Sequence, residues 1–302
     1  MIENTRAIDR TAVIILTVGI LFILSPLVFV VITATQSYDQ FVQHNFSLIP
    51  GSHFFDNLLE VWRRTQLPLQ TWNSFVVSLV AGGGRVTLAF FSAFAIVFFA
   101  ARYRPLIYAA VLASIMLPLN LMVITAYQVA ANVALPINAI ANMGDLWQSI
   151  FGSQLDLQYN ILESYAGIAI PLMAQGTATL ILVQFMRTLP IDLARAATMD
   201  GAGPLRFMWD ILLPLSRAPM ISLFLYLFIS AWVEYLWPLI AASTPEHQVA
   251  VVGLTRLDDQ MEDAIPNYPL LMAGAIMVTS IPLILIAIFQ RHIVRGLTLS
   301  EK

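Results

Sequence analysis

The amino-acid sequence predicts an all-α polytopic membrane protein with six transmembrane helices. The first observation is composition: 59% of the 302 residues are hydrophobic and only 11% are charged, whereas soluble domains carry about 25% charged residues. The second is a mean hydropathy of +0.78. The third is length, because a helix that crosses the hydrocarbon core needs about 20 apolar residues, and several windows of this chain reach that length.

Six apolar segments account for the predicted spans. They are residues 11–33, 73–100, 105–126, 166–186, 220–242 and 269–290. The first segment follows Arg6 and Arg10, as the apolar region of a signal peptide would. Its apolar run is longer than a signal peptide uses, and no A-x-A-like cleavage site closes it. We therefore expect it to be retained as a membrane helix.

The distribution of basic residues predicts that both termini face the cytoplasm, because Arg and Lys are enriched in cytoplasmic loops. With the N-terminus inside, eleven basic residues are cytoplasmic, while Arg63, Arg64 and Arg256 lie outside and Arg85 lies within the membrane. This topology requires an even number of spans. We expect an N-terminal helix with the first outer loop at residues 1–72 and a membrane core at residues 73–290. The core contains a cytoplasmic loop at residues 187–218, and a cytoplasmic tail follows at residues 291–302.

The cytoplasmic loop contains the longest stretch of mixed polarity, "RAATMDGAGPLRFMWDILLP". Good helix formers precede Asp200 and Gly201, and glycine tolerates the left-handed conformation that commonly ends a helix. Gly203 and Pro204 then begin a second helix, which we expect to end at Pro214. The resulting helix–turn–helix pattern fits an ordinary connecting loop with two interfacial helices. It fits equally a compact element that inserts into another protein.

Several classes of function are disfavoured by what the sequence lacks. The chain has no Cys and its four His are far apart, so we expect no thiol chemistry and no metal site. A P-loop requires an internal Lys, but the only Lys is Lys302. No Ser-Lys, paired Asp or His-Glu-x-x-His set stands out within the spans, which argues against an intramembrane enzyme. No clear internal repeat supports an ion-coupled secondary transporter, and we expect no nucleic-acid partner.

The cytoplasmic loop resembles the EAA loop of permease subunits in bacterial ABC importers. That family pattern is E-A-A, two further residues and D-G-A, followed nine residues after the Gly by I-x-L-P. The matching residues, with the adjoining Gly203, are Ala196, Ala197, Asp200, Gly201, Ala202, Ile211, Leu213 and Pro214. Arg195 stands where the family has Glu. Either the surface of the ATPase differs there, or a second permease subunit keeps the Glu and the complex is asymmetric.

This resemblance implies a type I ABC importer permease in the bacterial inner membrane, a transport subunit and not an enzyme. The chain would form one half of a translocation pore with a homologous permease subunit. Two separate ATPase subunits would bind ATP and Mg, a periplasmic solute-binding protein would deliver the solute, and membrane lipid would surround the spans. No cofactor is implied for this chain. Closure of the ATPases would move the docked loop and tilt the spans from inward-open to outward-open.

Further stretches resemble permeases of the sugar or maltose-system class. They are "SAFAIVFFAARYRPL", "ESYAGIAIPLM" and "YLWPL". "MIEN", "SLIPGSHFFDNL" and "RGLTLSEK" bring the chain nearer to the second permease subunit of glycerol-3-phosphate importers. The resemblance therefore implies transport of glycerol-3-phosphate or a related glycerophosphodiester, with a sugar or oligosaccharide as the alternative. An ion-coupled secondary transporter is a distant alternative.

Two charged residues fall inside predicted spans, where charge is costly and usually functional. They are Arg85 and Glu234, which either pair with each other or line the substrate path. Arg85 suits a phosphate-bearing substrate. Ser230, Trp232 and Tyr235 add groups that suit polyols and sugars, although aromatic residues near the end of a span also serve as interface anchors.

Two segments are left with open interpretations. Residues 132–160 form a longer outer loop than the resembled subunit has, and it either contacts the solute-binding protein, packs as a cap on the permease or is a passive insertion. The triple glycine at residues 82–84 permits either close packing of helices or local unwinding.

Overall fold

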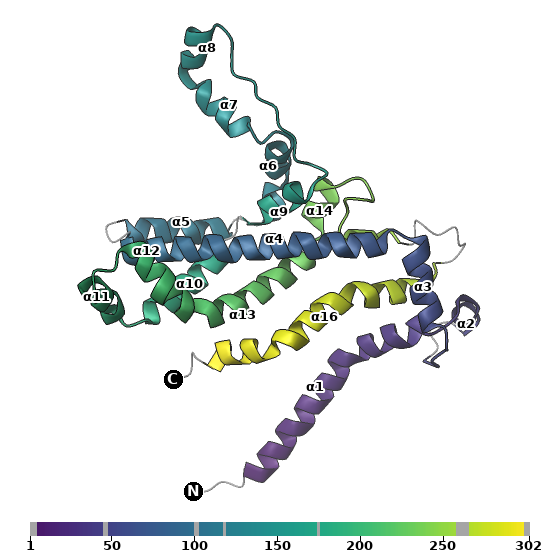
Figure 1. Ribbon diagram of the computed structural model, residues 1–302. Helices are drawn as coiled ribbons and strands as arrows, with labels where there is room; N and C mark the ends of the chain where they lie inside the picture. Colours follow the sequence, from purple (N-terminus) through teal and green to yellow (C-terminus); the bar gives the residue numbers. More distant parts are fainter. Residues whose placement is uncertain are drawn as a thin grey trace. The chain divides into compact units, whose positions relative to one another are not determined.

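The computed structural model describes residues 5–44, 48–99, 103–116, 119–173, 176–257 and 266–298. Within these ranges every regular element is a helix, as Figure 1 shows, so the predicted all-α class is confirmed. Some predictions fall outside them. They include the last residue of the second predicted span (Ala100), Arg102, residues 117–118 and 174–175 of the third and fourth predicted spans, the "MIEN" start, residues 258–265 between the last two predicted spans and the final residues with Lys302.

One compact unit comprises residues 1–68 and 253–280. Its helices are α1 (Thr5–Ala34), α2 (Tyr38–His44), α3 (Phe54–Arg64) and the first part of α16 (Tyr268–Thr298). Asn57 of α3 is buried, and its amide donates to the carbonyl oxygens of Ala34 and Gln36, both at 2.9 Å. These bonds fasten α3 to the end of α1. The apolar window of α1 has none of its residues buried in the protein, so its side chains are left for lipid.

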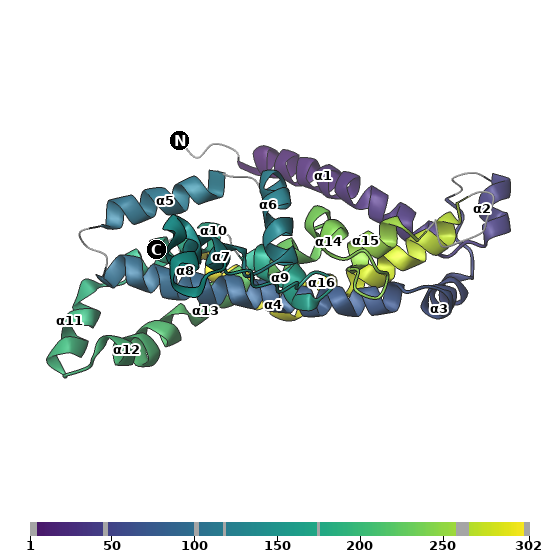
Figure 2. The ribbon, with the colours of Figure 1, turned by 90° about the horizontal axis from the view of Figure 1, so that it is seen from above.

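The second unit comprises residues 69–252 and 281–302, and it begins with the long helix α4 (Leu67–Phe94), which continues as the π-helix η1 (Ala95–Phe99). The elements that follow are α5 (Arg104–Met116), α6 (Leu119–Ala131), α7 (Leu135–Ala141), η2 (Met143–Asp145), α8 (Leu146–Phe151), α9 (Tyr165–Met173), α10 (Gly176–Thr188), α11 (Ile191–Met199), α12 (Pro204–Phe207), η3 (Met208–Leu212), α13 (Leu213–Trp232), α14 (Leu236–Ala241) and α15 (Ala250–Thr255). Figure 2 shows α5 beside α10, and residues of these two helices are in contact.

The core of this unit forms two clusters along α4. One joins the second half of α4 to α10 and η3 through buried residues such as Phe94, Leu182 and Leu212, and the other joins α4 to α9 and α14. At Gly82, a Cβ atom would lie 3.1 Å from the backbone nitrogen of Phe228 on α13. The glycines therefore permit close helix packing, and because α4 is helical throughout residues 82–84, the alternative of local unwinding is wrong.

Four described helical segments are long and apolar enough to cross a membrane, or up to six if two bent pairs each count as one span. The four are Arg10–Ala34, Leu67–Phe99, Pro204–Trp232 and Tyr268–Gln290. The bent pairs are Met122–Ala131 with Leu135–Ala141, at 82°, and Tyr165–Met173 with Gly176–Thr188, at 48°. The structure thus agrees with a polytopic membrane protein and leaves the span count between four and six.

Three predicted spans each fall on two described helices. The third, predicted over 105–126, comprises α5 and part of α6, and the fourth, predicted over 166–186, comprises α9 and most of α10. Residues 117–118 and 174–175, between these helices, lie outside the described ranges. The fifth, predicted over 220–242, ends as α13 at Trp232 and resumes as α14 at Leu236. Pro238 then sits in the first turn of α14, where its missing amide proton is tolerated.

Candidate functional site

The 187–218 loop contains the bend that its sequence predicts. Helix α11 ends at Met199, and Gly201 adopts φ 74°. The amides of Gly201 and Ala202 donate back to the carbonyl oxygens of Thr198 and Ala197, at 3.0 and 2.8 Å. Gly203 then begins α12 in an extended conformation, with Pro204 as the first helical residue. The bend is therefore determined by neighbouring residues along the chain, and it contains a left-handed position that favours glycine.

The second helix of the loop does not end at Pro214 as predicted. Helix α12 passes through the π-helix η3 into α13 without leaving helical geometry. Pro214 is the second residue of α13, a position where the lost amide proton falls in the first turn of the regular α-helix. The loop is consequently continuous with a membrane-spanning helix, so a displacement of the bend can be passed along α13.

The two alanines of the motif point in different directions. Ala197 is buried and packs into the core cluster with η1 and α12, whereas Ala196 is exposed. Arg195 is also exposed, and its guanidinium pairs with the carboxylate of Asp192 at 3.3 Å. The outward face of α11 therefore carries a small residue beside a cation that is already matched by an acid one turn away. The sequence interpretation missed this compensation, although i,i+3 spacing on a helix indicates it.

Arg85 is buried in α4 and does not form a direct ion pair with Glu234. Its Nε donates to the carbonyl oxygen of Leu172 in the last turn of α9. Its Nη1 has no hydrogen-bond partner among the described residues, and their ion pairs within 4.0 Å do not include Arg85. Arg85 thus satisfies a helix-end carbonyl and keeps donor capacity for a second group.

The other residues predicted for the substrate path lie around the break between α13 and α14. Ser230 and Glu234 are half-buried, and Tyr235 is 39% exposed. Trp232 is only 3% exposed, and its ring stacks on Phe228 with centroids 5.7 Å apart. The structure therefore places Trp232 in the packed core and leaves Tyr235 more accessible. Non-helical backbone at membrane depth is tolerated where it is buried in protein or lines a cavity.

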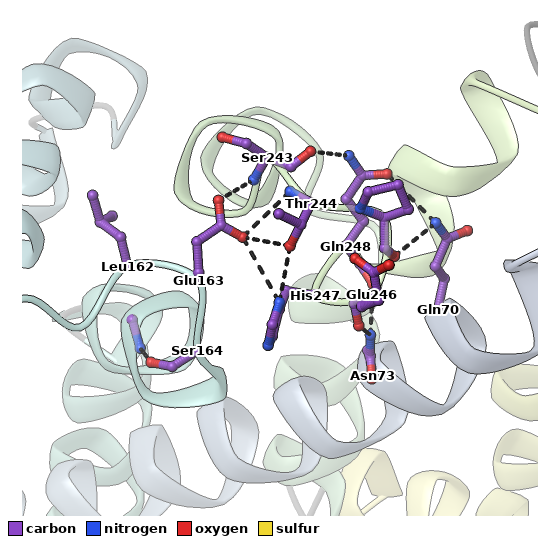
Figure 3. Close-up of polar contacts among 12 residues, drawn as sticks. Gln70, Asn73, Leu162, Glu163, Ser164, Ser243, Thr244, Glu246, His247 and Gln248 are labelled. Carbon is purple, nitrogen blue, oxygen red and sulfur yellow. Dashed lines mark hydrogen bonds and ion pairs between the residues drawn. The ribbon is translucent and has the colours of Figure 1, made fainter.

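A polar network that the sequence analysis missed surrounds Glu163, as Figure 3 shows. The Glu163 carboxylate accepts hydrogen bonds from the Ser243 amide at 2.6 Å and from the Thr244 hydroxyl at 2.9 Å and amide at 3.3 Å. His247 Nδ1 lies 3.9 Å from the same carboxylate and bonds the Thr244 hydroxyl at 2.9 Å. Glu163 itself has φ 57°, an uncommon conformation for a non-glycine residue.

The same network reaches the start of α4. The Asn73 amide donates to the carbonyl oxygens of Glu246 and Gln248 at 2.8 and 3.0 Å, and its oxygen accepts from the Tyr165 hydroxyl at 2.7 Å. Gln70 donates to the carbonyl oxygen of Pro245 at 3.1 Å. We call these residues the Glu163 network: Gln70, Asn73, Glu163, Tyr165, Ser243, Thr244, His247 and Gln248. Amides one turn apart at the start of an apolar helix are the only sequence signal of it.

The pKa of the Glu163 carboxyl lies below its ordinary value. Burial alone raises this pKa because it disfavours the charged form, but the hydrogen bonds donated by Ser243 and Thr244 favour the charged form and outweigh burial. The network therefore holds a carboxylate anion and not a carboxylic acid at neutral pH.

Comparison with known proteins assigns the chain to a family. Residues 86–299 match the family described as "Binding-protein-dependent transport system inner membrane component". The chain is 34% identical to the sn-glycerol-3-phosphate transport system permease protein UgpE of Yersinia pestis bv. Antiqua (strain Antiqua), with 100% of both chains covered. UgpE proteins of Pectobacterium atrosepticum and Brucella melitensis biotype 1 are 35% and 33% identical at the same coverage.

A solved structure shares the fold. It is the crystal structure of a bacterial ABC transporter involved in the import of the acidic polysaccharide alginate, with a TM-score of 0.71 and 18% identity over 96% of this chain and 98% of that chain. The family and the relatives confirm the predicted resemblance to importer permeases, an inner-membrane location and the role of a transport subunit and not an enzyme. This chain therefore belongs to the family of inner-membrane components of binding-protein-dependent transport systems.

Proposed function

We propose that this chain forms half of the translocation path of an ATP-driven importer, paired with a homologous permease subunit and served by a periplasmic solute-binding protein. Two ATPase subunits bind ATP and Mg. Six spans with both termini in the cytoplasm fit the distribution of basic residues. In this proposal α5 with α6 forms the third span, and the bent pair of α9 and α10 forms the fourth. The division into residues 1–72, 73–290 and 291–302 belongs to the same proposal.

The 187–218 loop docks into the ATPase in this proposal. The observation that carries it is the exposed α11, which is fixed from behind by Ala197 and ends in the Gly201 bend. The docking residues are Arg195, Ala196, Ala197, Asp200, Gly201, Ala202, Gly203, Ile211, Leu213 and Pro214. Because η3 joins this loop directly to α13, movement of the ATPase is transmitted to a span that ends beside Glu234.

The proposed substrate is glycerol-3-phosphate or a related glycerophosphodiester. Support comes from the glycerol-3-phosphate transport permeases that are similar to this chain over its full length. Arg85 contributes a buried cation with an unused donor, which suits a phosphate oxygen. A sugar or oligosaccharide is the second candidate, favoured by the half-buried hydroxyl of Ser230 and the partly exposed Tyr235 beside the α13 break. The path residues in the proposal are Arg85, Ser230, Trp232, Glu234 and Tyr235.

The test is ATPase activity of the reconstituted importer with its solute-binding protein. We expect glycerol-3-phosphate to stimulate hydrolysis and maltose to have no effect, and the reverse result would overturn the proposed substrate.

The role of Arg85 is tested with two variants: Arg85→Lys keeps the cation and Arg85→Gln removes it. If Arg85 contacts phosphate, glycerol-3-phosphate uptake survives better in the Lys variant, whereas equal uptake in both variants would remove Arg85 from the path.

A further inference from the structure

An open cavity of about 220 Å³ lies where the 187–218 loop leaves and rejoins the membrane helices. Its wall is mostly apolar and includes Phe98, Met186, Leu212 and Leu215. The segment that enters α11 and the start of α13 both contribute to it. The cavity is therefore a binding surface for an apolar chain, shared by the two ends of the loop.

Two arginines lie in this apolar wall, Arg104 at the start of α5 and Arg187 in the last turn of α10. Arg104 is held in place because its Nε and Nη2 donate to the carbonyl oxygens of Ile96 and Val97, at 3.0 and 2.6 Å. The Arg187 guanidinium lies over the ring of Tyr108, 5.2 Å from its centroid. Tyr108 is one helical turn from Arg104, so both cations are fixed to neighbouring turns of α5.

Neither arginine is neutralised by a carboxylate within the described part of the chain. The ion pairs closer than 4.0 Å there do not include Arg104 or Arg187. The two acids adjacent in sequence to wall residues, Asp192 and Asp210, already pair with Arg195 and Arg206. No acid lines the cavity. Two cations beside an apolar surface, without an anion, form a site for a ligand that has an anionic end and an apolar end.

We propose that this cavity binds one anionic phospholipid of the inner leaflet, with its phosphate between Arg104 and Arg187 and part of an acyl chain against Leu212 and Leu215. The location fits, because both arginines stand at helix ends that face the cytoplasm in the proposed topology, at the level of the lipid headgroups. Basic pockets between membrane helices on the cytoplasmic side are suited to anionic headgroups. A soluble phosphate compound would leave the apolar wall uncovered.

Such a lipid contacts both ends of the 187–218 loop. It touches Leu189, Pro190 and Ile191 where the chain enters α11, and Ile211 and Leu215 after α11. A bound lipid therefore braces the loop against η1 and α5. Coupling between ATP hydrolysis and uptake should depend on anionic lipid, a property separate from the identity of the solute.

The experiment measures phosphatidylglycerol retained by the whole importer after detergent washing, by native mass spectrometry. Arg187→Gln is the main variant because this side chain is exposed and makes no backbone hydrogen bond in the described chain. Arg217→Gln is the matched control, an exposed arginine on α13 outside the cavity. We expect retention to fall about fivefold in Arg187→Gln, the effect of one cation near a lipid surface, and to stay unchanged in Arg217→Gln.

Two further arms separate this site from simpler explanations. Leu215→Trp narrows the apolar wall without changing charge, and it should also reduce retention. The unaltered importer should retain phosphatidylglycerol in preference to phosphatidylethanolamine, and inorganic phosphate should not displace the lipid. Equal retention of both lipids, equal retention by Arg187→Gln and Arg217→Gln, or displacement by phosphate alone would each overturn the proposal. Retention is measured without solute, so it does not depend on the proposed substrate.

Discussion

The 187–218 loop and the Glu163 network are both connections between helices, yet they are held in opposite ways. The loop depends on a short-range bend at Gly201 and on apolar side chains such as Ala197 and Phe207 that pack into the core, and two of its arginines pair with nearby acids at the surface. The network is fastened by side chains that bond backbone groups eighty or more positions away. The first arrangement leaves a face free for another protein, whereas the second uses its polar groups within the chain.

Of these two regions, the 187–218 loop is the one suited to move. A helix whose outer face has no partner in its own chain can change partners at little cost. A buried amide that bonds three groups cannot, because each broken bond leaves a desolvated donor or acceptor. We therefore expect α4, α9 and the 242–249 segment to move as one body during transport, while the 187–218 loop follows the ATPase.

The largest expected effect is at Asn73. Asn73→Ala removes the donors to the carbonyl oxygens of Glu246 and Gln248 and the acceptor of the Tyr165 hydroxyl. We expect the free energy of unfolding of the purified protein to fall by about 2–3 kcal/mol, as measured by chemical denaturation in detergent. The control is Thr87→Ala on the same helix, whose exposed hydroxyl bonds only within α4. Equal denaturation midpoints for both variants would show that the network is not stabilising.

The next effect is at the bend. Gly201→Val places a β-branched residue at φ 74°, which costs about 1–2 kcal/mol of backbone strain. We expect the bend to rearrange and the amount of co-purified ATPase to fall about tenfold. Gly83→Val is the matched control, because Gly83 is an ordinary helical residue of α4 outside the loop and has open space around it. If both variants retain ATPase equally, the Gly201 bend is not needed for docking.

A smaller effect is expected from protonation of Glu163. Its folded-state pKa lies below the unfolded value, so the carboxylate contributes stability above the ordinary carboxyl pKa of about 4.3, and that contribution is lost as pH falls through the folded-state pKa. Solvent screens the effect because the side chain is 35% exposed. Thermal unfolding between pH 7 and pH 3 should show a shallower acid loss for Glu163→Gln than for the natural chain. Parallel curves would contradict this.

The smallest effect on stability is expected at Arg195. Arg195→Glu replaces an exposed pair with Asp192 by two acids one turn apart, a change of about 0.5 kcal/mol or less. The effect of Arg195→Glu on binding of the ATPase is a more informative measurement than its effect on stability. If the ATPase cleft is matched to a cation here, titration of the ATPase should show weaker association with Arg195→Glu than with Arg195→Gln. Stronger association would indicate a cleft that still prefers the family's acid.

The sequence predicted the parts of this protein that depend on neighbours along the chain. Long apolar runs predicted helices that are long and apolar enough to cross a membrane, and the order Asp200, Gly201, Gly203 and Pro204 predicted the bend with its left-handed glycine. The sequence failed at Pro214, which was predicted to end a helix. In the structure the helix continues through the π-helix η3, and Pro214 falls in the first turn of α13. A single proline does not reveal whether the preceding turn can adjust.

Only the tertiary structure could decide which distant groups meet. Arg85 bonds the end of α9 and not Glu234, the carboxylate of Glu163 receives donors from residues eighty positions later, and Arg104 and Arg187 share one cavity. The physical reason is range: hydropathy and turn chemistry act over a few residues and are written locally in the sequence. A buried polar group instead takes whichever donor or acceptor the packing of the helices brings to it, and that partner is set by the fold as a whole.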